Sequence, residues 1–422
     1  MITHLAARRY RCFRDWQQVE LGQLTLIYGE NGAGKSALLR LLPWLAASGR
    51  QGLPTLDLRW PGLRGAGWGE VCWSGRGDDA APDAERASWW GEDPEYHDPD
   101  LALGMRAAGW TVSWRLRRWD TPDWRWLDVL HAAQGDGPQR TLRARGRPSE
   151  GLTHSFSWGE QVEGLRFDGL IPRSGRGAAG PALESVGDAL AAVRWLGPRR
   201  VGSDRAGERR GLTPPPLDGD GAAAQAIALA DPALLERVSR WYHEHCDATL
   251  ARAAHGPEAD RLVLRRADRA DLPFPDAGEG LQQAFAVLVG AEQLRARGGL
   301  LAVEEPEVSL HPRLQRALAD HFVEVACAQP EAQVLLETHS EVMLLSALHA
   351  AVKHGVKVRL HWVEAGAGGG ARVREVGLDA EGRPRDTTLT DAFDTMGVQR
   401  RALIDARRQR APGAPRGGAG VG

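Results

Sequence analysis

The glycine-rich segment at residues 29–36 constrains the fold of this 422-residue chain more than any other feature. It reads Gly-Glu-Asn-Gly-Ala-Gly-Lys-Ser, follows a short apolar run at residues 24–28, and precedes leucines at helical spacing. A strand, a glycine-rich loop and a helix in this order form the context that the GxxxxGK[ST] pattern requires. Because glycines let successive backbone N–H groups turn toward phosphates at the start of the helix, the segment predicts a nucleotide site in an α/β fold.

The loop residues have separate expected roles. Lys35 is expected to reach the β- and γ-phosphates, and the Ser36 hydroxyl to bind Mg²⁺. Of 53 basic residues only three are lysines, so a lysine here indicates that a compact ammonium is needed. This context disfavours a plain glycine-rich turn before an ordinary helix, and Pro43 is expected to end or kink the helix early. The residues expected to line the nucleotide are Gly29, Glu30, Asn31, Gly32, Ala33, Gly34, Lys35, Ser36 and Ala37.

A pair of glutamates supplies the second half of the predicted site. Residues 300–303 read as another buried strand, which ends at Glu304 and Glu305. Ligands in open α/β sheets bind at the carboxyl ends of the strands. Adjacent side chains leaving a strand point in different directions, so we expect Glu304 to hold Mg²⁺ and Glu305 to polarise the attacking water. A glutamate pair is usually just solvated, but the sequence that follows, residues 307–312, disfavours that interpretation.

A histidine follows a third apolar run, at residues 334–336. His339 lies 34 residues after Glu305, beyond one predicted helix at residues 313–328, which places it on a neighbouring strand. There it could contact the γ-phosphate or the attacking water. Taken alone, a histidine at the end of a strand is more often an ordinary surface residue.

Assembled in this order, these residues resemble an ABC-type P-loop ATPase of the OLD-like (overcoming-lysogenization-defect) and SMC-like soluble group. Residues 29–36 resemble Walker A, 300–305 Walker B, 307–312 the D-loop, and 338–340 the switch-histidine segment. The resemblance implies ATP and Mg²⁺ as cofactors, and ATP hydrolysis in a head-to-tail homodimer or higher oligomer. It also implies catalytic roles for Glu305 and His339.

The segment at residues 276–283 stands where this family carries the ABC signature, and it lacks the usual serine. Its small residues predict that Gly278 and Gly280 present backbone N–H groups, at a helix start, to the γ-phosphate held by the facing protomer. Similar serine-less versions resemble those of OLD-like ATPases. The glutamine of the Q-loop is not assigned.

The expected fold class is α/β: a P-loop NTPase, as an ABC-type ATPase head, with an inserted antiparallel β-rich subdomain and a helical signature subdomain. Ten of the sixteen tryptophans lie between Trp60 and Trp126, which favours the core of a small sheet over a stacking platform for bases. A helix is expected through residues 228–253. The expected parts are the core at 1–45 and 290–380, the β-rich insert at 46–195, an arginine-rich linker at 196–220, the helical subdomain at 221–289, and an extension at 381–422 with a disordered tail from 411.

Composition favours a cytoplasmic protein with no membrane partner. No stretch approaches the roughly 20 apolar residues that span a bilayer, no export signal opens the chain, and the four cysteines are scattered. The net charge of −2 gives no general attraction to DNA. An acidic segment at residues 78–100 is expected to be a solvated loop. An arginine cluster could meet nucleic-acid phosphate or the partner protomer, or form a plain solvated loop: Arg194, Arg199, Arg200, Arg205, Arg209 and Arg210.

Only about sixty residues follow the last core strand, too few for the Toprim nuclease domain that many OLD proteins carry. The ATPase is therefore expected to sense a trigger, most plausibly DNA, and to regulate a separately encoded effector such as a nuclease. The resemblance alone suggests a setting in anti-phage defence. Two alternatives remain: a nucleotide-gated scaffold with little hydrolysis, and a transporter's motor subunit, which the missing signature serine disfavours.

Overall fold

A computed structural model describes residues 1–49, 54–73, 101–118, 125–144, 154–158, 161–173, 179–202, 204, 207–208, 214–217, 219–256, 259–366, 369–379 and 381–385. The chain divides into two compact units, Met1–Glu375 and Val376–Gly422. In the second unit a bridge between Leu378 and Pro384 closes a turn. The predicted acidic loop at residues 78–100, the tail from residue 411, and three of the clustered arginines (Arg205, Arg209 and Arg210) lie outside the described residues.

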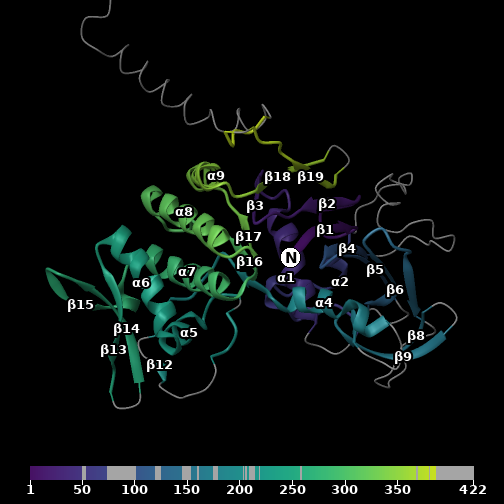
Figure 1. Cartoon of the computed structure of the whole chain (residues 1–422), viewed down its shortest axis with the longest axis horizontal. Helices are drawn as coiled ribbons and strands as arrows, with labels where there is room; N and C mark the ends of the chain where they lie inside the picture. The colour runs from purple at the N-terminus through teal and green to yellow at the C-terminus, as the bar shows by residue number, and fades with distance from the viewer. Residues whose placement is uncertain are drawn as a thin grey trace, which may run out of the picture. The chain divides into compact units, whose positions relative to one another are not determined.

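A six-stranded sheet carries the residues expected at the nucleotide (Figure 1). Its first five strands pair in parallel, and β19 pairs antiparallel to β18. All three predicted strands, at residues 24–28, 300–303 and 334–336, are confirmed, and their carboxyl ends meet at one edge. The strands in spatial order are β11 (Val193–Leu196), β16 (Gly299–Glu304), β17 (Ala332–Glu337), β3 (Leu24–Gly29), β18 (Val358–Ala365) and β19 (Ala371–Glu375).

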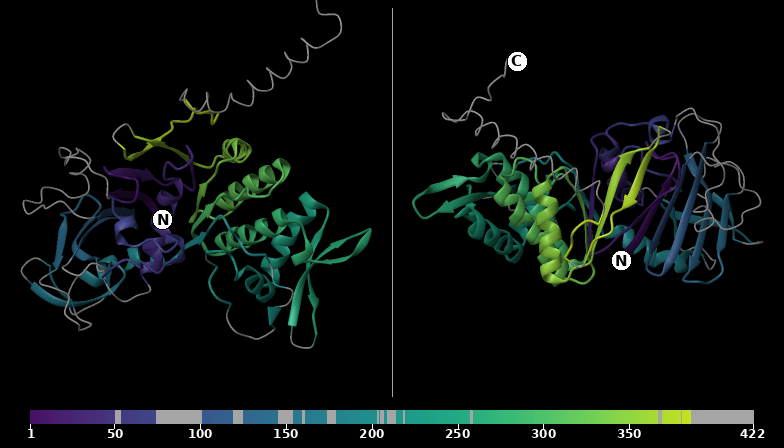
Figure 2. Two further views of the ribbon diagram at one scale, coloured as in Figure 1. Left: turned by 180° about the vertical axis from the view of Figure 1, so that it is seen from behind. Right: turned by 90° about the horizontal axis from the view of Figure 1, so that it is seen from above.

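Helices cover both faces of this sheet. α1 (Lys35–Ser48) packs on one side, and α7 (Glu279–Arg297) and α8 (Pro312–Ala328) pack on the other, with α9 (Glu341–His354) against α8 (Figures 1 and 2). The prediction that Pro43 ends α1 is wrong, because the helix continues to Ser48. Buried leucines on both sides of the proline hold the later turns in the core, and this packing outweighs the lost backbone hydrogen bond.

The predicted β-rich insert supplies most strands of a nine-stranded antiparallel sheet. Two strands from outside the predicted insert, β1 and β2, complete it, because β1 pairs with both β2 and β4. Conversely, β11 (Val193–Leu196), three of whose four residues fall in the range 46–195, belongs to the parallel sheet. The strands are β1 (Ile2–Arg8), β2 (Gln17–Glu20), β4 (Leu101–Ala107), β5 (Trp110–Arg118), β6 (Arg125–Gln134), β7 (Arg140–Ala144), β8 (His154–Trp158), β9 (Gln161–Asp168) and β10 (Ile171–Arg173).

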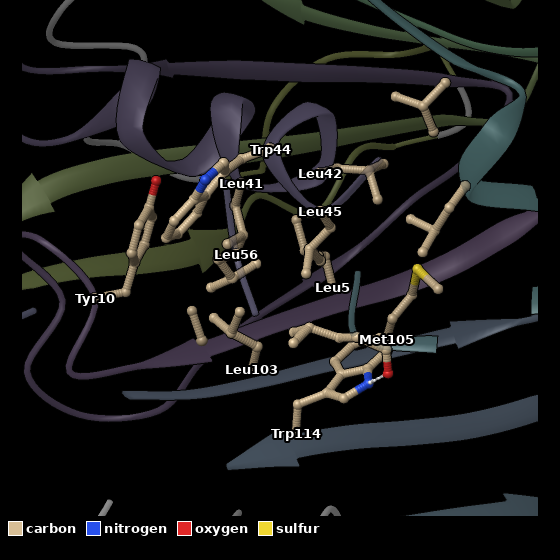
Figure 3. Packing of buried hydrophobic residues seen from close by; sticks show 14 of the residues in the cluster. Leu5, Tyr10, Leu41, Leu42, Trp44, Leu45, Leu56, Leu103, Met105 and Trp114 are labelled. Carbon is tan, nitrogen blue, oxygen red and sulfur yellow. Dashed lines mark hydrogen bonds between the residues drawn. The ribbon is translucent and has the colours of Figure 1, made fainter. Parts of the chain in front are cut away.

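The main hydrophobic core lies between α1 and this antiparallel sheet (Figure 3). Trp44 of α1 is fully buried, stacks on Tyr10 at a ring-centroid distance of 6.0 Å, and donates its Nε1–H to the carbonyl oxygen of Asp57 at 2.7 Å. Leu103 and Met105 of β4 contribute to the same cluster. Four tryptophans of the insert are at most 8% exposed, so the core interpretation is confirmed for these four: Trp60, Trp68, Trp110 and Trp114.

The predicted helical subdomain is a mixture of helices and strands. Its helices are α5 (Ala224–Ala230) and α6 (Pro232–Cys246), and the expected helix through residue 253 is wrong. Asp247 adopts a left-handed φ of 50° and ends α6, after which the chain turns into β13 (Thr249–Ala254).

The remaining elements of the chain are β12 (Gly207–Glu208), β14 (Ala259–Arg266), β15 (Arg269–Pro273), η1 (Pro61–Leu63), α2 (Trp68–Val71), α4 (Ala179–Ala191) and η2 (Phe274–Asp276). None of the described helices is long and apolar enough to cross a bilayer.

Trp44 tests how strongly α1 depends on the antiparallel sheet. We expect Trp44→Ala to lower the free energy of unfolding by about 3–5 kcal/mol, because it opens a cavity in a fully buried contact. Urea denaturation followed by far-UV circular dichroism measures this change. The control is Leu345→Ala on α9, where a side chain 46% exposed should change stability by less than about 0.5 kcal/mol. Equal midpoints for the two variants would contradict this account of the core.

Candidate nucleotide-binding site

The loop between β3 and α1 requires glycine at two positions. Gly29 has a φ of 147°, and a Cβ there would lie 2.1 Å from the carbonyl oxygen of Val363. Gly34 has a φ of 107°, and its Cβ would lie 2.3 Å from the Sγ of Cys12. Gly32 also has a positive φ, of 78°, with open space around it. The backbone therefore takes the curled path that only glycine allows, as a phosphate-binding loop needs.

Lys35 lies within this loop. Its side chain is 3% exposed, and its Nζ donates to the carbonyl oxygens of Gly29 at 2.9 Å and Glu30 at 2.6 Å. Burial lowers the pKa of Lys35, although the nearby carboxylate of Glu337 acts in the opposite direction. The ammonium is thus held over the loop by two neutral carbonyl oxygens. Charged phosphate oxygens are stronger acceptors and could replace them.

The Ser36 hydroxyl meets a carboxylate that the sequence interpretation missed. It donates to Oε1 of Glu337, the last residue of β17, at 2.7 Å. Glu337 is 1% exposed, and its Oε2 is buried without a hydrogen-bond partner among the described residues. Burial raises the pKa of Glu337 to about 7, and the hydrogen bond from Ser36 offsets only part of that rise. Its place at the carboxyl end of the third predicted strand was the signal available in the sequence.

The side chain of Glu304, expected to hold Mg²⁺, is hydrogen-bonded elsewhere. Its Oε1 accepts from Nε of Arg40 at 2.7 Å and from Nε1 of Trp195 at 2.8 Å, and its Oε2 accepts from Nη2 of Arg40. Glu304 is 1% exposed and Arg40 8%. Although burial acts to lower the pKa of Arg40, the hydrogen bonds and charge of Glu304 raise it above its ordinary value. Both carboxylate oxygens of Glu304 are therefore engaged within the protein.

The backbone of Glu305 is held in the left-handed region, with a φ of 44°. Its N–H donates to the carbonyl oxygen of Glu337 at 2.8 Å, and its carbonyl oxygen accepts from Nη2 of Arg200 at 3.0 Å. The other Nη of Arg200 donates to the carbonyl oxygens of Glu304 at 2.9 Å and Gly197 at 2.7 Å. Burial lowers the pKa of Arg200 to about 10, and the side chain faces inward. The suggested nucleic-acid contact is therefore wrong for Arg200.

Glu307 fixes the loop that carries His339. Its Oε1 accepts from Oγ1 of Thr338 at 2.7 Å and from the backbone N–H groups of His339 at 2.8 Å and Ser340 at 3.1 Å. His339 itself is exposed. Partial desolvation, and then the positive charge of Lys35, lower the pKa of its imidazole. The structure thus brings His339 to the same sheet edge as Lys35 and Glu305.

The two glycines expected in the signature segment differ in their surroundings. Gly278 is the exposed N-cap residue of α7, and a Cβ there would meet nothing within 4 Å. A Cβ on Gly280 would lie 2.3 Å from the carbonyl oxygen of Ser309, so Gly280 packs against its own chain. Farther along α7, Gln283 exchanges hydrogen bonds with the backbone N–H and C=O of Arg200, at 3.3 and 2.8 Å. Gly278 is therefore the glycine available to a facing molecule.

The residues around Ser36 fit a magnesium ion. Mg²⁺ prefers oxygen ligands and is usually bound through one or two carboxylates together with substrate phosphates. A serine hydroxyl and a buried carboxylate oxygen without a partner lie together here, on Ser36 and Glu337. Among the described residues, no group of three or more His, Cys, Asp or Glu side chains could hold a metal ion by itself.

The Arg40–Glu304 pair gives a prediction about stability. Arg40→Met should lower the free energy of unfolding by about 3–5 kcal/mol, because it leaves a buried carboxylate without its cation. The double variant Arg40→Met/Glu304→Leu should recover only part of that loss, because an apolar pair needs no solvation but the buried Nε1–H of Trp195 loses its acceptor. A double-mutant cycle by urea denaturation measures the coupling. Losses that simply add would show that the two side chains do not stabilise each other.

Comparison with protein families finds two separate matches. Residues 231–346 match the family described as "AAA domain, putative AbiEii toxin, Type IV TA system", and residues 5–54 match one described as "AAA domain". No curated protein matches the sequence of the chain.

Solved structures of SMC head domains are among those similar to the chain, at low identity. The SMC head domain from Thermotoga maritima is 10% identical over 89% of this chain and 99% of that chain, with a TM-score of 0.42. The Smc head domain with an extended coiled coil, bound to the C-terminal domain of ScpA from Pyrococcus furiosus, is 10% identical over 94% and 99%, with a TM-score of 0.47. With its glycine loop at the edge of a parallel sheet, the chain has a P-loop NTPase fold, and two stretches of it match AAA-type ATPase domains.

Proposed function

We propose that this chain binds ATP with Mg²⁺ and hydrolyses it between two copies arranged head to tail. One observation carries the proposal: Glu337 joins the P-loop to the residue expected to activate water. Its carboxylate accepts from Ser36, and its backbone carbonyl accepts from the N–H of Glu305. The phosphate loop and the candidate general base are therefore linked by two hydrogen bonds through Glu337, on the strand that lies between β3 and β16.

In the proposed reaction the chain's own residues bind, orient and accept a proton. Lys35 exchanges its two carbonyl acceptors for the β- and γ-phosphate oxygens, while the loop N–H groups hold the rest of the triphosphate. Bound Mg²⁺ would neutralise phosphate charge. Glu305, with its backbone fixed by Arg200, orients the attacking water and accepts its proton. His339, whose imidazole has a lowered pKa, positions the γ-phosphate or that water.

The second copy is proposed to complete the site through Gly278. A helix N-terminus attracts anions, and that of α7 is exposed and uncrowded at this glycine. The γ-phosphate bound by one protomer is the anion proposed to meet it. A nucleotide-gated scaffold with little hydrolysis would use the same contact, but it would not depend on Glu305.

We place the ATPase in the OLD-like group, as a regulatory module that acts on a separately encoded effector such as a nuclease. DNA is the trigger to test first, and anti-phage defence is the proposed setting. The motif order and the serine-less signature support this proposal, and the family that matches residues 231–346 is described as an AAA domain and putative AbiEii toxin of a Type IV TA system. A transporter's motor subunit is the least supported alternative.

Variants at Lys35 and Glu305 test ATP binding and ATP hydrolysis separately. Lys35→Ala should abolish ATP binding, because it removes the cation expected at the β- and γ-phosphates. Glu305→Gln should keep ATP binding and lower kcat by roughly 10²-fold or more, because the amide accepts no proton from water. Nucleotide binding and phosphate release are measured with and without double-stranded DNA. Wild-type kcat in Glu305→Gln would reject Glu305 as the base. ATP binding without turnover in the wild type would favour the scaffold, and turnover indifferent to DNA would remove DNA as the trigger.

Gly278 tests the head-to-tail dimer. Gly278→Asp should leave stability intact, because aspartate is a favoured N-cap residue and a Cβ at this position meets no atom within 4 Å. It should nevertheless abolish turnover, since its charge would face the γ-phosphate of the other copy. Gly278→Asn, with the same shape and no charge, is the matched control and should retain more activity. Mixing Gly278→Asp with Glu305→Gln should restore part of the turnover, because mixed dimers contain one intact site; no recovery would argue against a shared site.

A further inference from the structure

Glu337 lies one strand nearer to the P-loop than Glu304. β17 runs between β16 and β3, and the Cα of Glu337 is paired with Glu304 on one side and with Ile27 on the other. Two residues beyond Ile27 the chain enters the glycine loop that leads to Ser36. Of the two carboxylates at the same level of the sheet, Glu337 is the one that contacts Ser36.

Glu304 could bind a metal ion only by giving up its present partners. Its two oxygens accept from Nε and Nη2 of Arg40 and from Nε1 of Trp195. All three residues are buried, so releasing the carboxylate would leave a guanidinium and an indole N–H without an acceptor away from water. The geometry makes Glu304 a positioning residue that holds α1 through Arg40.

Glu337 differs from Glu304, because only one of its two carboxylate oxygens accepts a hydrogen bond among the residues that the structure describes. Oε1 accepts from Ser36, whereas Oε2 is buried and has no hydrogen-bond partner in the described part of the chain. Glu307 also has a buried oxygen without a partner, but its other oxygen is bonded to the His339 loop rather than to Ser36.

Resting on the proposed function, we infer that Glu337, and not Glu304, is the carboxylate that holds the Mg²⁺ ion of bound ATP beside Ser36. The ion would take the unpaired Oε2 as ligand, directly or through a water, together with the Ser36 hydroxyl and phosphate oxygens. Glu304 keeps its bonds to Arg40 throughout. Its contribution to the site is to orient α1, and with it Ser36.

The test compares two isosteric amides in the full chain, Glu337→Gln and Glu304→Gln. The affinity for the non-hydrolysable analogue AMP-PNP is measured with Mn²⁺ and again with EDTA, and the ratio gives the metal-dependent gain. Electron paramagnetic resonance of the bound Mn²⁺ reports on its ligands in the same samples. Glutamine at position 337 can still accept the Ser36 hydrogen bond, so a lost gain there reflects the missing carboxylate charge.

We expect Glu337→Gln to reduce the metal-dependent gain about 10- to 100-fold and to change the Mn²⁺ spectrum, with little change in the EDTA affinity. Glu304→Gln, whose amide oxygen can still accept from Arg40, should keep most of the metal-dependent gain and the wild-type spectrum and show a lower unfolding midpoint. The reverse pattern, or a wild-type gain in Glu337→Gln, would overturn the inference. If Glu304→Gln does not fold, the comparison of Glu337→Gln with wild type decides alone.

Lys35→Ala separates failure of this inference from failure of the proposed function. If wild type and Lys35→Ala bind AMP-PNP equally poorly, both the proposed nucleotide site and this inference are rejected. If binding depends on Lys35 but Glu337→Gln keeps the full metal-dependent gain, the nucleotide site stands and the assignment of Glu337 is rejected.

Discussion

The buried ion pair between Arg40 and Glu304 orients the helix on which the candidate site depends. Removing two charges from water is costly, and here the cost is offset by two hydrogen bonds from one guanidinium and a third from Trp195. The pair joins α1 to β16 across 264 residues of sequence. Ser36 and Arg40 are four residues apart, so they lie on one face of α1. Once Arg40 is fixed on β16, Ser36 is carried to the end of the next strand, where Glu337 lies.

A second buried guanidinium holds the backbone that Glu305 needs. A non-glycine residue at positive φ costs about 1–3 kcal/mol and persists only where its surroundings impose it. For Glu305 these surroundings are Arg200 and the carbonyl oxygen of Glu337. Arg200 is in turn bonded through its own backbone to Gln283 of α7. The hydrogen bonds from α7 to Glu305 are continuous, so the position of Glu305 depends on the helix that begins at Gly278.

Local patterns were enough to predict the strands and loops that carry the expected site. Short apolar runs that end in glycine or glutamate predicted β3, β16 and β17, because such runs suit strands buried on both faces. Local patterns did not predict the structure where tertiary packing determines it. Nothing local shows that α1 survives Pro43, or that the chain after Asp247 joins a sheet.

The sequence alone could not show that Glu337, and not Glu304, contacts Ser36 of the P-loop, and the reason is physical. Glu304 follows an apolar run and precedes a second glutamate, as an acid that holds metal would. Its actual partners, Arg40 and Trp195, are distant in sequence and look like ordinary helix and strand residues. Glu337 resembles a lone surface carboxylate until β17 is placed between β16 and β3. Residue type and spacing therefore locate the acids at the sheet edge, but strand order decides which acid meets the P-loop.

Gly278 and Gly280 differ in their surroundings, and this difference is the reason for proposing a second copy at the site. Gly280 uses its missing side chain inside the protomer, where the carbonyl of Ser309 fills the space. Ser309 has a φ of 60°, so this close approach is part of a turn already bent by the hydrogen bond from Leu310 to Glu307. Gly278, at the start of the same helix, is exposed and touches no such neighbour. An open helix N-terminus is poorly satisfied by its own chain and well satisfied by an anion, which is the physical reason for proposing a second copy's bound phosphate there.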